Sequence, residues 1–155
     1  MQVEIYCDCG ANHIQSLPDP LFRFVCHCTT CRTFSGAPHN DECTFLLKEC
    51  SGLNLANTEF QSYQSGFSPI KRGRCKRCGK VTCCIAHVWP YPEFLMIPSR
   101  LVKGRPLPDP LAHIYYDSRV ADATDSFKKI NGHFRGQLAI QTAIVGSLFK
   151  RMRRA

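Results

Sequence analysis

The sequence lacks several features that would argue against a folded intracellular domain, such as membrane spans and low-complexity segments. No segment of the 155 residues is apolar over the length of a membrane span. The N-terminal stretch MQVEIYCDCG has no basic region followed by an apolar run, so we expect no signal peptide. We find no internal repeat and no low-complexity segment. The expected location is the cytoplasm, with the nucleus as an alternative.

The cysteine content argues against a disulfide framework. The chain has 11 cysteines, an odd number, without a secretion signal. The cysteines could instead bind metal, take part in catalysis or simply be buried, and their clustering favours metal binding. Seven cysteines form three short groups: Cys7 and Cys9; Cys26, Cys28 and Cys31; Cys75 and Cys78. The other four lack such spacing, and we interpret them as small buried apolar residues: Cys43, Cys50, Cys83 and Cys84.

The pattern of turns predicts a mainly β fold built from small sheets. Ten glycines and ten prolines separate short stretches with strand character. The strand candidates cover residues 3–6, 11–17, 21–28, 43–47, 58–63, 70–74, 80–88, 93–97 and 113–117. Residues 29–36 are expected to form one or two helical turns, with Thr29 or Thr30 as the cap and Gly36 at the end.

The pattern changes to a helical one near the C-terminus. Apolar residues recur at roughly helical spacing and basic residues crowd the end of the chain. We therefore divide the chain into a zinc domain at residues 1–133 and a basic amphipathic helix at 134–155. We expect the helix to dock on the same domain; binding to a partner or a membrane surface is the alternative.

Two of the cysteine groups have the form of zinc knuckles. The stretches CDCG (7–10) and CKRCG (75–79) each offer two thiolates from a tight turn that ends in glycine. Two knuckles that face each other make a closed tetrahedral site. We predict that Cys7, Cys9, Cys75 and Cys78 bind a structural zinc ion, although spacing alone does not prove the pairing.

The stretch CHCTTC (26–31) offers three thiolates from one short segment. On an extended chain Cys26 and Cys28 project to the same face, whereas His27 points away. A helical turn after Cys28 would bring Cys31 back to them. Three ligands leave a fourth zinc position open, and three soft thiolates favour a sulfur ligand there. The alternative is that Cys43, Cys50 or another residue closes the site.

The three groups in order resemble the family of glutathione-dependent formaldehyde-activating enzymes and centromere protein V. The pattern C-x-C-G, C-H-C-x-x-C-R-x-x-S-G, C-x-x-C-G fits, and the segments SYQSG (62–66) and HIYYDSRV (113–120) also resemble the family. The resemblance implies a β-tent fold of small antiparallel sheets. It also implies two zinc ions per chain: a structural ion on Cys7, Cys9, Cys75 and Cys78, and a catalytic ion on Cys26, Cys28 and Cys31.

The activity implied by the resemblance is a carbon–sulfur lyase reaction. The founding reaction condenses formaldehyde with glutathione to S-(hydroxymethyl)glutathione. The stretch APHNDECTF (37–45) is polar where many members have small apolar and aromatic residues. His39, Asp41 and Glu42 are acid–base candidates there, and a solvated loop is the alternative.

Other functions remain open at this point. One alternative is a zinc-assisted dehydratase, hydrolase or isomerase acting on a metabolite, with residues 39–42 transferring protons. Another is a module that binds nucleic acid or protein through KRGRCKRCGK (71–80) and the basic tail, although aromatic residues do not interleave that basic run. A third is that both zinc ions only hold the fold.

The cations of residues 71–80 would either hold an anionic substrate such as glutathione or form a solvated surface: Lys71, Arg72, Arg74, Lys76, Arg77 and Lys80. The sequence leaves the oligomeric state open.

Overall fold

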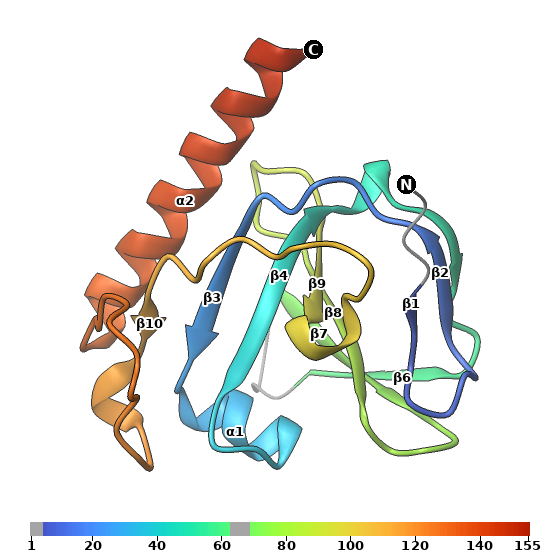
Figure 1. Cartoon of the computed structure of the whole chain (residues 1–155), viewed down its shortest axis with the longest axis horizontal. Coiled ribbons are helices and arrows are strands. Elements are labelled where there is room, and N and C mark those ends of the chain that lie inside the picture. The colour runs from blue at the N-terminus through green and yellow to red at the C-terminus, as the bar shows by residue number, and fades with distance from the viewer. Residues whose placement is uncertain (1–4, 63–68) are drawn as a thin grey trace. The chain divides into compact units, whose positions relative to one another are not determined.

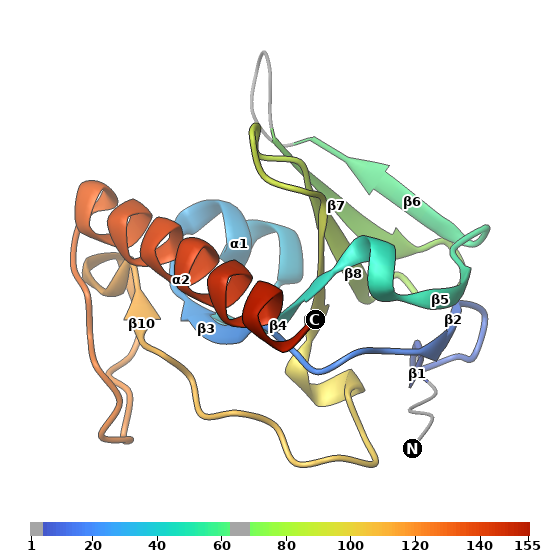
Figure 2. The same ribbon diagram turned by 90° about the horizontal axis from the view of Figure 1, so that it is seen from above.

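The structure is a computed structural model that describes residues 5–62 and 69–155 (Figures 1 and 2). The chain forms two compact units, each built from two separate segments. The first unit comprises residues 1–20 and 42–107, and the second comprises residues 21–41 and 108–155. The predicted division at residue 133 stays a prediction, and the C-terminal helix is part of the second unit.

The first unit begins with a small antiparallel sheet in the order β1-β2-β5. Its strands are β1 (Ile5–Tyr6), β2 (His13–Ser16) and β5 (Ser51–Asn54). The turn between β1 and β2 carries the first cysteine pair, so the sheet fixes the start and the end of this knuckle. The 3-10 helix η1 (Leu47–Glu49) precedes β5.

Five further strands of the first unit follow the order β4-β9-β8-β7-β6, and their printed pairings are antiparallel. They are β4 (Asn40–Leu46, of which 42–46 belong to this unit), β6 (Thr58–Gln61), β7 (Ile70–Cys75), β8 (Val81–Ala86) and β9 (Phe94–Pro98), followed by η2 (Ser99–Leu101). Phe45, Leu95 and Ile97 are fully buried and anchor its core. This apolar core supports the second knuckle at the end of β7.

The second unit contains β3 (Phe22–Cys26), α1 (Thr29–Ser35), β10 (His113–Ile114), η3 (Tyr116–Ser118) and α2 (His133–Arg154). Strand β10 pairs with β3 in parallel, with Ile114 opposite Cys26. The resemblance had implied antiparallel sheets, but the long connection between these strands permits a parallel pair. Figures 1 and 2 show the first turns of α2 beside β10.

The expected strand at residues 113–117 ends early. Only His113 and Ile114 are in β10, because Tyr115 adopts a left-handed conformation with φ +52°. A tyrosine in that region costs about 1–2 kcal/mol and breaks strand pairing. This turn redirects the chain after the strand and sets the position of the Tyr115 ring.

The two predicted helices are present. Helix α1 ends at Gly36, as expected, but its cap is the Cys28 side chain rather than Thr29 or Thr30. Helix α2 begins one residue before Phe134 and buries Gly136 and Ile144. Within the described residues, neither helix is long and apolar enough to cross a membrane.

Candidate metal centres and pocket

Four cysteines of the first unit meet at one point. The sulfur atoms of Cys7, Cys9, Cys75 and Cys78 all lie within 4.8 Å of one another. The Cys7–Cys9, Cys7–Cys75 and Cys9–Cys75 sulfur separations are 3.4, 3.8 and 3.5 Å. Tetrahedral zinc with Zn–S bonds of about 2.3 Å separates its sulfur atoms by about 3.8 Å. This four-cysteine group could therefore hold a metal ion, and its donor set fits zinc.

The backbone shapes both knuckles of the four-cysteine group in the same way. Gly10 and Gly79 have φ values of +75° and +71°, and their amides donate to the carbonyl oxygens of Cys7 and Cys75 at 2.8 Å. Glycine reaches this conformation without steric cost. The glycine after each cysteine pair therefore closes the turn that aims the sulfur atoms at one another.

Backbone amides also prepare the four-cysteine group for a cation. Burial raises the pKa of the Cys7 thiol, but hydrogen bonds from the Asn12 amide and from neighbouring cysteines lower it to about 6. The Asn12 and Arg77 amides each donate to a cysteine sulfur at 3.4 Å. Part of the thiolate charge that a metal ion needs is thus stabilised by the fold itself.

The three-cysteine group lies in the second unit and comes from one short segment. The sulfur atoms of Cys26, Cys28 and Cys31 lie within 4.8 Å of one another. Cys26 ends β3, Cys28 caps α1 and Cys31 lies in its first turn. The Cys31 amide donates to the Cys28 sulfur at 3.3 Å, so the start of the helix brings the third sulfur back, as the sequence predicted.

No fourth protein ligand joins the three-cysteine group in residues 5–62 and 69–155. No histidine, cysteine, aspartate or glutamate of these segments places a ligand atom with the three sulfurs. Hydrogen bonds from Cys28 and Cys31 and burial together raise the pKa of the Cys26 thiol. Three adjacent thiolates repel one another, and a soft divalent cation such as zinc relieves that repulsion. The donor set fits a metal ion with one open position.

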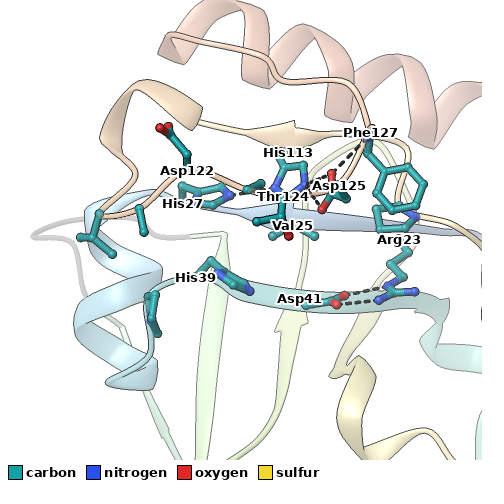
Figure 3. Close-up of a pocket in the computed structure, with 15 residues that line it drawn as sticks. Arg23, Val25, His27, His39, Asp41, His113, Asp122, Thr124, Asp125 and Phe127 are labelled. Atoms are coloured by element: carbon teal, nitrogen blue, oxygen red, sulfur yellow. Dashed lines mark hydrogen bonds and ion pairs between the residues drawn. The ribbon is translucent and has the colours of Figure 1, made fainter.

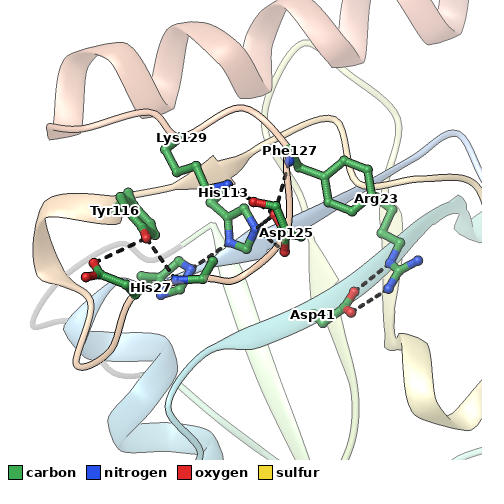
Figure 4. A network of polar contacts seen from close by, with 10 residues as sticks. Arg23, His27, Asp41, His113, Tyr116, Asp125, Phe127 and Lys129 are labelled. Atoms are coloured by element: carbon green, nitrogen blue, oxygen red, sulfur yellow. Dashed lines mark hydrogen bonds and ion pairs between the residues drawn. The ribbon is translucent and has the colours of Figure 1, made fainter.

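His27 faces away from the three sulfurs, as the alternation of the strand predicted. It is 3% exposed and its Nε2 lies 2.9 Å from His113 Nδ1. His113 Nε2 in turn donates to Asp125 at 2.9 Å. Burial, followed by electrostatic repulsion from His113 and His39, lowers the pKa of His27 to about 4. His27 is therefore neutral, and its Nε2–H donates to His113 (Figure 4).

A pocket of about 400 Å³ opens on the His27 side of β3 (Figure 3). Val25 lines it from β3, His27 from the residue that follows β3, and His113 and Asp125 from the C-terminal segment. Its described lining contains none of the three cysteines, and Cys26 projects from the opposite face of the strand. The three-cysteine group and this pocket thus lie on either side of one strand.

The three acid–base candidates occupy different surroundings. His39 lines the pocket, with its ring centroid 5.3 Å from that of His27. Asp41 also lines it, but Arg23 binds both of its oxygens at 2.7 and 2.6 Å (Figures 3 and 4). Glu42 is the first residue of the second segment of the first unit, and its carboxylate lies 3.7 Å from the Cys84 sulfur. Their acid–base role stays a prediction.

Tyr115 is a site residue that sequence reasoning missed. Gln137 Nε2 donates to its hydroxyl oxygen at 2.6 Å, and a Cβ at Gly136 would lie 3.3 Å from its ring. Burial raises the pKa of Tyr115, and negative charge on the three cysteines raises it further. The hydroxyl is therefore within electrostatic reach of the three-cysteine group. The strand pattern of HIYYD hid this role, because nothing in it marks a left-handed tyrosine.

Asn40 is a second residue that was missed. It is 8% exposed, and its Nδ2 has no hydrogen-bond partner in the described part of the chain. Because Asp41 faces the pocket, Asn40 faces the other side of β4, as Cys26 does on β3. A buried amide donor without a partner is uncommon in folded proteins. The polarity of residues 37–45 was the only sequence signal that could have pointed to Asn40. It led instead to the titratable residues His39, Asp41 and Glu42.

Many cations of residues 71–80 are engaged within the first unit. Arg72 is buried, and Arg74 and Lys76 donate to the carbonyl oxygens of Gly79 and Ala56. Lys80 pairs with Asp8 at 3.5 Å. The Lys80–Asp8 pair joins the two knuckles of the four-cysteine group.

The remaining cysteines behave largely as the sequence indicated. Cys43, Cys83 and Cys84 are at most 2% exposed, and Cys50 is half-buried. Burial raises the pKa of Cys83 to about 12 and that of Cys50 to about 11. In the described residues, neither cysteine group includes any of the four.

The chain matches the family model described as glutathione-dependent formaldehyde-activating enzyme over residues 2–118. The chain belongs to this family. The matched region contains all seven grouped cysteines, whereas α2 lies beyond it. The family description names an enzyme activity, and the cysteine groups could supply its metal ligands.

One solved structure agrees with the fold of this family member. A Rhodobacter sphaeroides protein, solved as a structural genomics target, is 24% identical and has a TM-score of 0.50. The similarity covers 66% of this chain and 90% of the other. At this identity the likeness concerns the fold alone. No curated protein sequence matches the chain.

Proposed function

We propose that the chain is a zinc-dependent enzyme of the carbon–sulfur lyase type, which acts on a thiol and an aldehyde or on their adduct. Membership of the family supports the reaction class. The observation that carries the proposal is the three-cysteine group without a fourth ligand in residues 5–62 and 69–155. A closed site has no position for a reactant, whereas a three-ligand site has one.

The composition of the three-cysteine group supports sulfur chemistry. When bound, zinc would supply a soft acceptor with one position for the sulfur atom of a substrate thiolate. Cys26, Cys28 and Cys31 would hold that ion, and their combined negative charge makes it a weak Lewis acid. Capture of a thiol is therefore favoured over activation of water.

Tyr115 and Asn40 are suited to the oxygen atom of the substrate. When a thiolate adds to an aldehyde carbon, the carbonyl oxygen gains negative charge and takes up a proton. Tyr115 accepts from Gln137 at 2.6 Å, and its own hydrogen can be donated to the substrate oxygen in place of His133 Nδ1, which lies 3.4 Å away. The buried Asn40 amide would be a second donor on the same side of the strands. In this proposal, both groups stabilise the oxygen rather than bind the metal.

The first substrates to test are glutathione and formaldehyde, because the family is named for them. Exchange of carbon-13 formaldehyde between its free and S-hydroxymethyl forms can be followed by nuclear magnetic resonance, against the uncatalysed rate. We expect zinc-loaded protein to accelerate this exchange and the Cys28→Ser variant to be inactive. Equal rates for both proteins would overturn the proposal. Other small thiols in parallel would define the thiol that is used.

A second candidate function is proton transfer on a metabolite, and the pocket beside His27 favours it. His39 and Asp41 line that pocket, and Glu42 follows them on β4. If His39 exchanges a proton with a substrate, His39→Asn would remove one limb of the pH–rate profile and lower the rate about a hundredfold. An unchanged profile would rule His39 out.

A further inference from the structure

Helix α2 carries an apolar stripe along its outer side. The stripe consists of exposed side chains at spacings of four, seven, four and three residues: Phe134, Leu138, Val145, Phe149 and Met152. At 3.6 residues per turn, all five fall within about 60° around the helix axis. They are 50–78% exposed. A straight line of exposed large apolar residues over the whole helix is unusual for a surface that faces only water.

The opposite side of α2 already has its own contacts in the second unit. The buried Gly136 lies against the Tyr115 ring, and Ser147 Oγ donates to the Leu21 carbonyl oxygen at 3.2 Å. Gly136 and Ser147 lie about half a turn away from the stripe. The docking of α2 therefore fixes the helix with its apolar stripe facing outward.

The charges around the stripe all have one sign. Residues 126–155 contain no aspartate or glutamate. Arg135 and Arg153 are exposed on α2 about 70° from the middle of the stripe, and the Arg153 guanidinium lies 5.2 Å from the centroid of the Phe149 ring. Lys150 and Arg154 are exposed farther round the helix. Long basic side chains beside apolar residues extend along the same surface with their charges at its rim. The occupant of this face must bury apolar groups and carry negative charge.

We propose that α2 binds the surface of a membrane containing anionic phospholipids, with the stripe inserted at the level of the headgroups. An apolar stripe flanked by cations on a docked helix is the pattern of interfacial helices. A second copy of α2 is disfavoured, because two stripes in contact would bring two acid-free, cationic helices together. Nucleic acid would neutralise the charges but leave the apolar stripe exposed to water.

The test is co-sedimentation of the full chain with vesicles of phosphatidylcholine, alone or mixed with phosphatidylserine. We expect binding to the mixed vesicles and a decrease of binding at high salt. Phe149→Ser should weaken that binding about tenfold, because one buried aromatic side chain is lost. Leu111→Ser is the matched control, since Leu111 is 53% exposed and Phe149 is 54% exposed. Circular dichroism checks that both variants are folded.

A second pair of variants tests the charges. Arg135→Gln combined with Arg153→Gln should weaken binding about fivefold for each charge removed. Lys48→Gln combined with Lys103→Gln removes the same net charge from exposed positions outside α2 and should leave binding unchanged.

Three results would overturn the proposal. The first is the absence of binding to the mixed vesicles at low salt. The second is loss of binding through the charge variants but not through Phe149→Ser, which would show a general electrostatic attraction. The third is a wild-type dimer in sedimentation velocity that Phe149→Ser converts to a monomer, because a second copy would then be the occupant.

Discussion

The two cysteine groups differ in how the chain assembles them. The four-cysteine group joins residues 7–9 to residues 75–78, so its formation closes a loop of most of the first unit. The three-cysteine group takes all its members from six consecutive residues at the start of one helix. A metal ion on the first group would hold distant segments together, whereas one on the second would hold only a local turn. The number of ligands and the length of chain between them thus indicate different roles.

The largest expected effect comes from breaking the four-cysteine group. A structural zinc ion contributes roughly 10 kcal/mol or more to folding, which exceeds the stability of most domains. Cys78→Ser should therefore fail to give a cooperative thermal transition and should lose its structural metal. Cys50→Ser is the matched control, because Cys50 is outside both groups and a serine can keep its bond to the Leu46 carbonyl oxygen. A folded Cys78→Ser protein with unchanged metal content would contradict a structural role.

Breaking the three-cysteine group should leave the fold intact. Serine is a preferred helix cap, so Cys28→Ser keeps the start of α1 while removing one thiolate. We expect a melting temperature within a few degrees of the wild type, one metal ion fewer per chain by elemental analysis, and at least a hundredfold lower rate. Collapse of this variant would mean that both groups are structural.

A smaller effect is expected from Tyr115, whose pKa is raised by burial and by negative charge on the three-cysteine group. Tyr115→Phe removes the proposed oxygen donor and should lower kcat about tenfold to a hundredfold with unchanged metal content. Tyr116→Phe makes the same chemical change one residue away, where the hydroxyl accepts from the Ala123 amide at 2.9 Å. Equal losses of kcat for both variants would show that the hydroxyl of Tyr115 has no special role.

The smallest expected effect is a difference between two glycines: Gly36, which follows the three-cysteine group, and Gly79, which follows the second pair of the four-cysteine group. Gly36 and Gly79 have φ values of +67° and +71°, and an added Cβ at either would meet no atom within 4 Å. Alanine at either position should cost about 1 kcal/mol in unfolding free energy. Gly79→Ala should also speed transfer of metal to a chelator, because Gly79 closes a knuckle. Equal transfer rates in the two variants would argue against that closure.

Local chemistry made much of both cysteine groups predictable. The spacing of Cys26, Cys28 and Cys31 predicted that an extended residue followed by a helical turn would bring their sulfur atoms together. The structure contains that arrangement. Glycine after each cysteine pair predicted the closed knuckles. The pairing of the two knuckles depends on the folded sheets, so it could be seen only in the structure.

Features that depend on tertiary placement were not predictable in this way. Tyr115 gained its position from a left-handed backbone and from Gln137 on a helix that follows it. The pocket needs β3, residues 38–41 at the start of β4 and the segment 120–127 together, and no local pattern joins these segments. Sequence reasoning grouped His39, Asp41 and Glu42 as acid–base candidates, but strand alternation divides them between two faces.

The nesting of the chain has a consequence for the order of synthesis. Residues 42–107 of the first unit are inserted between the two segments of the second, and Ile114 pairs with Cys26 across that insertion. On the ribosome, every ligand of the four-cysteine group emerges before β10 exists. The first unit can thus bind its metal ion during translation, while β3 and its cysteines wait for their parallel partner. The half of the protein proposed to carry the reaction is completed last.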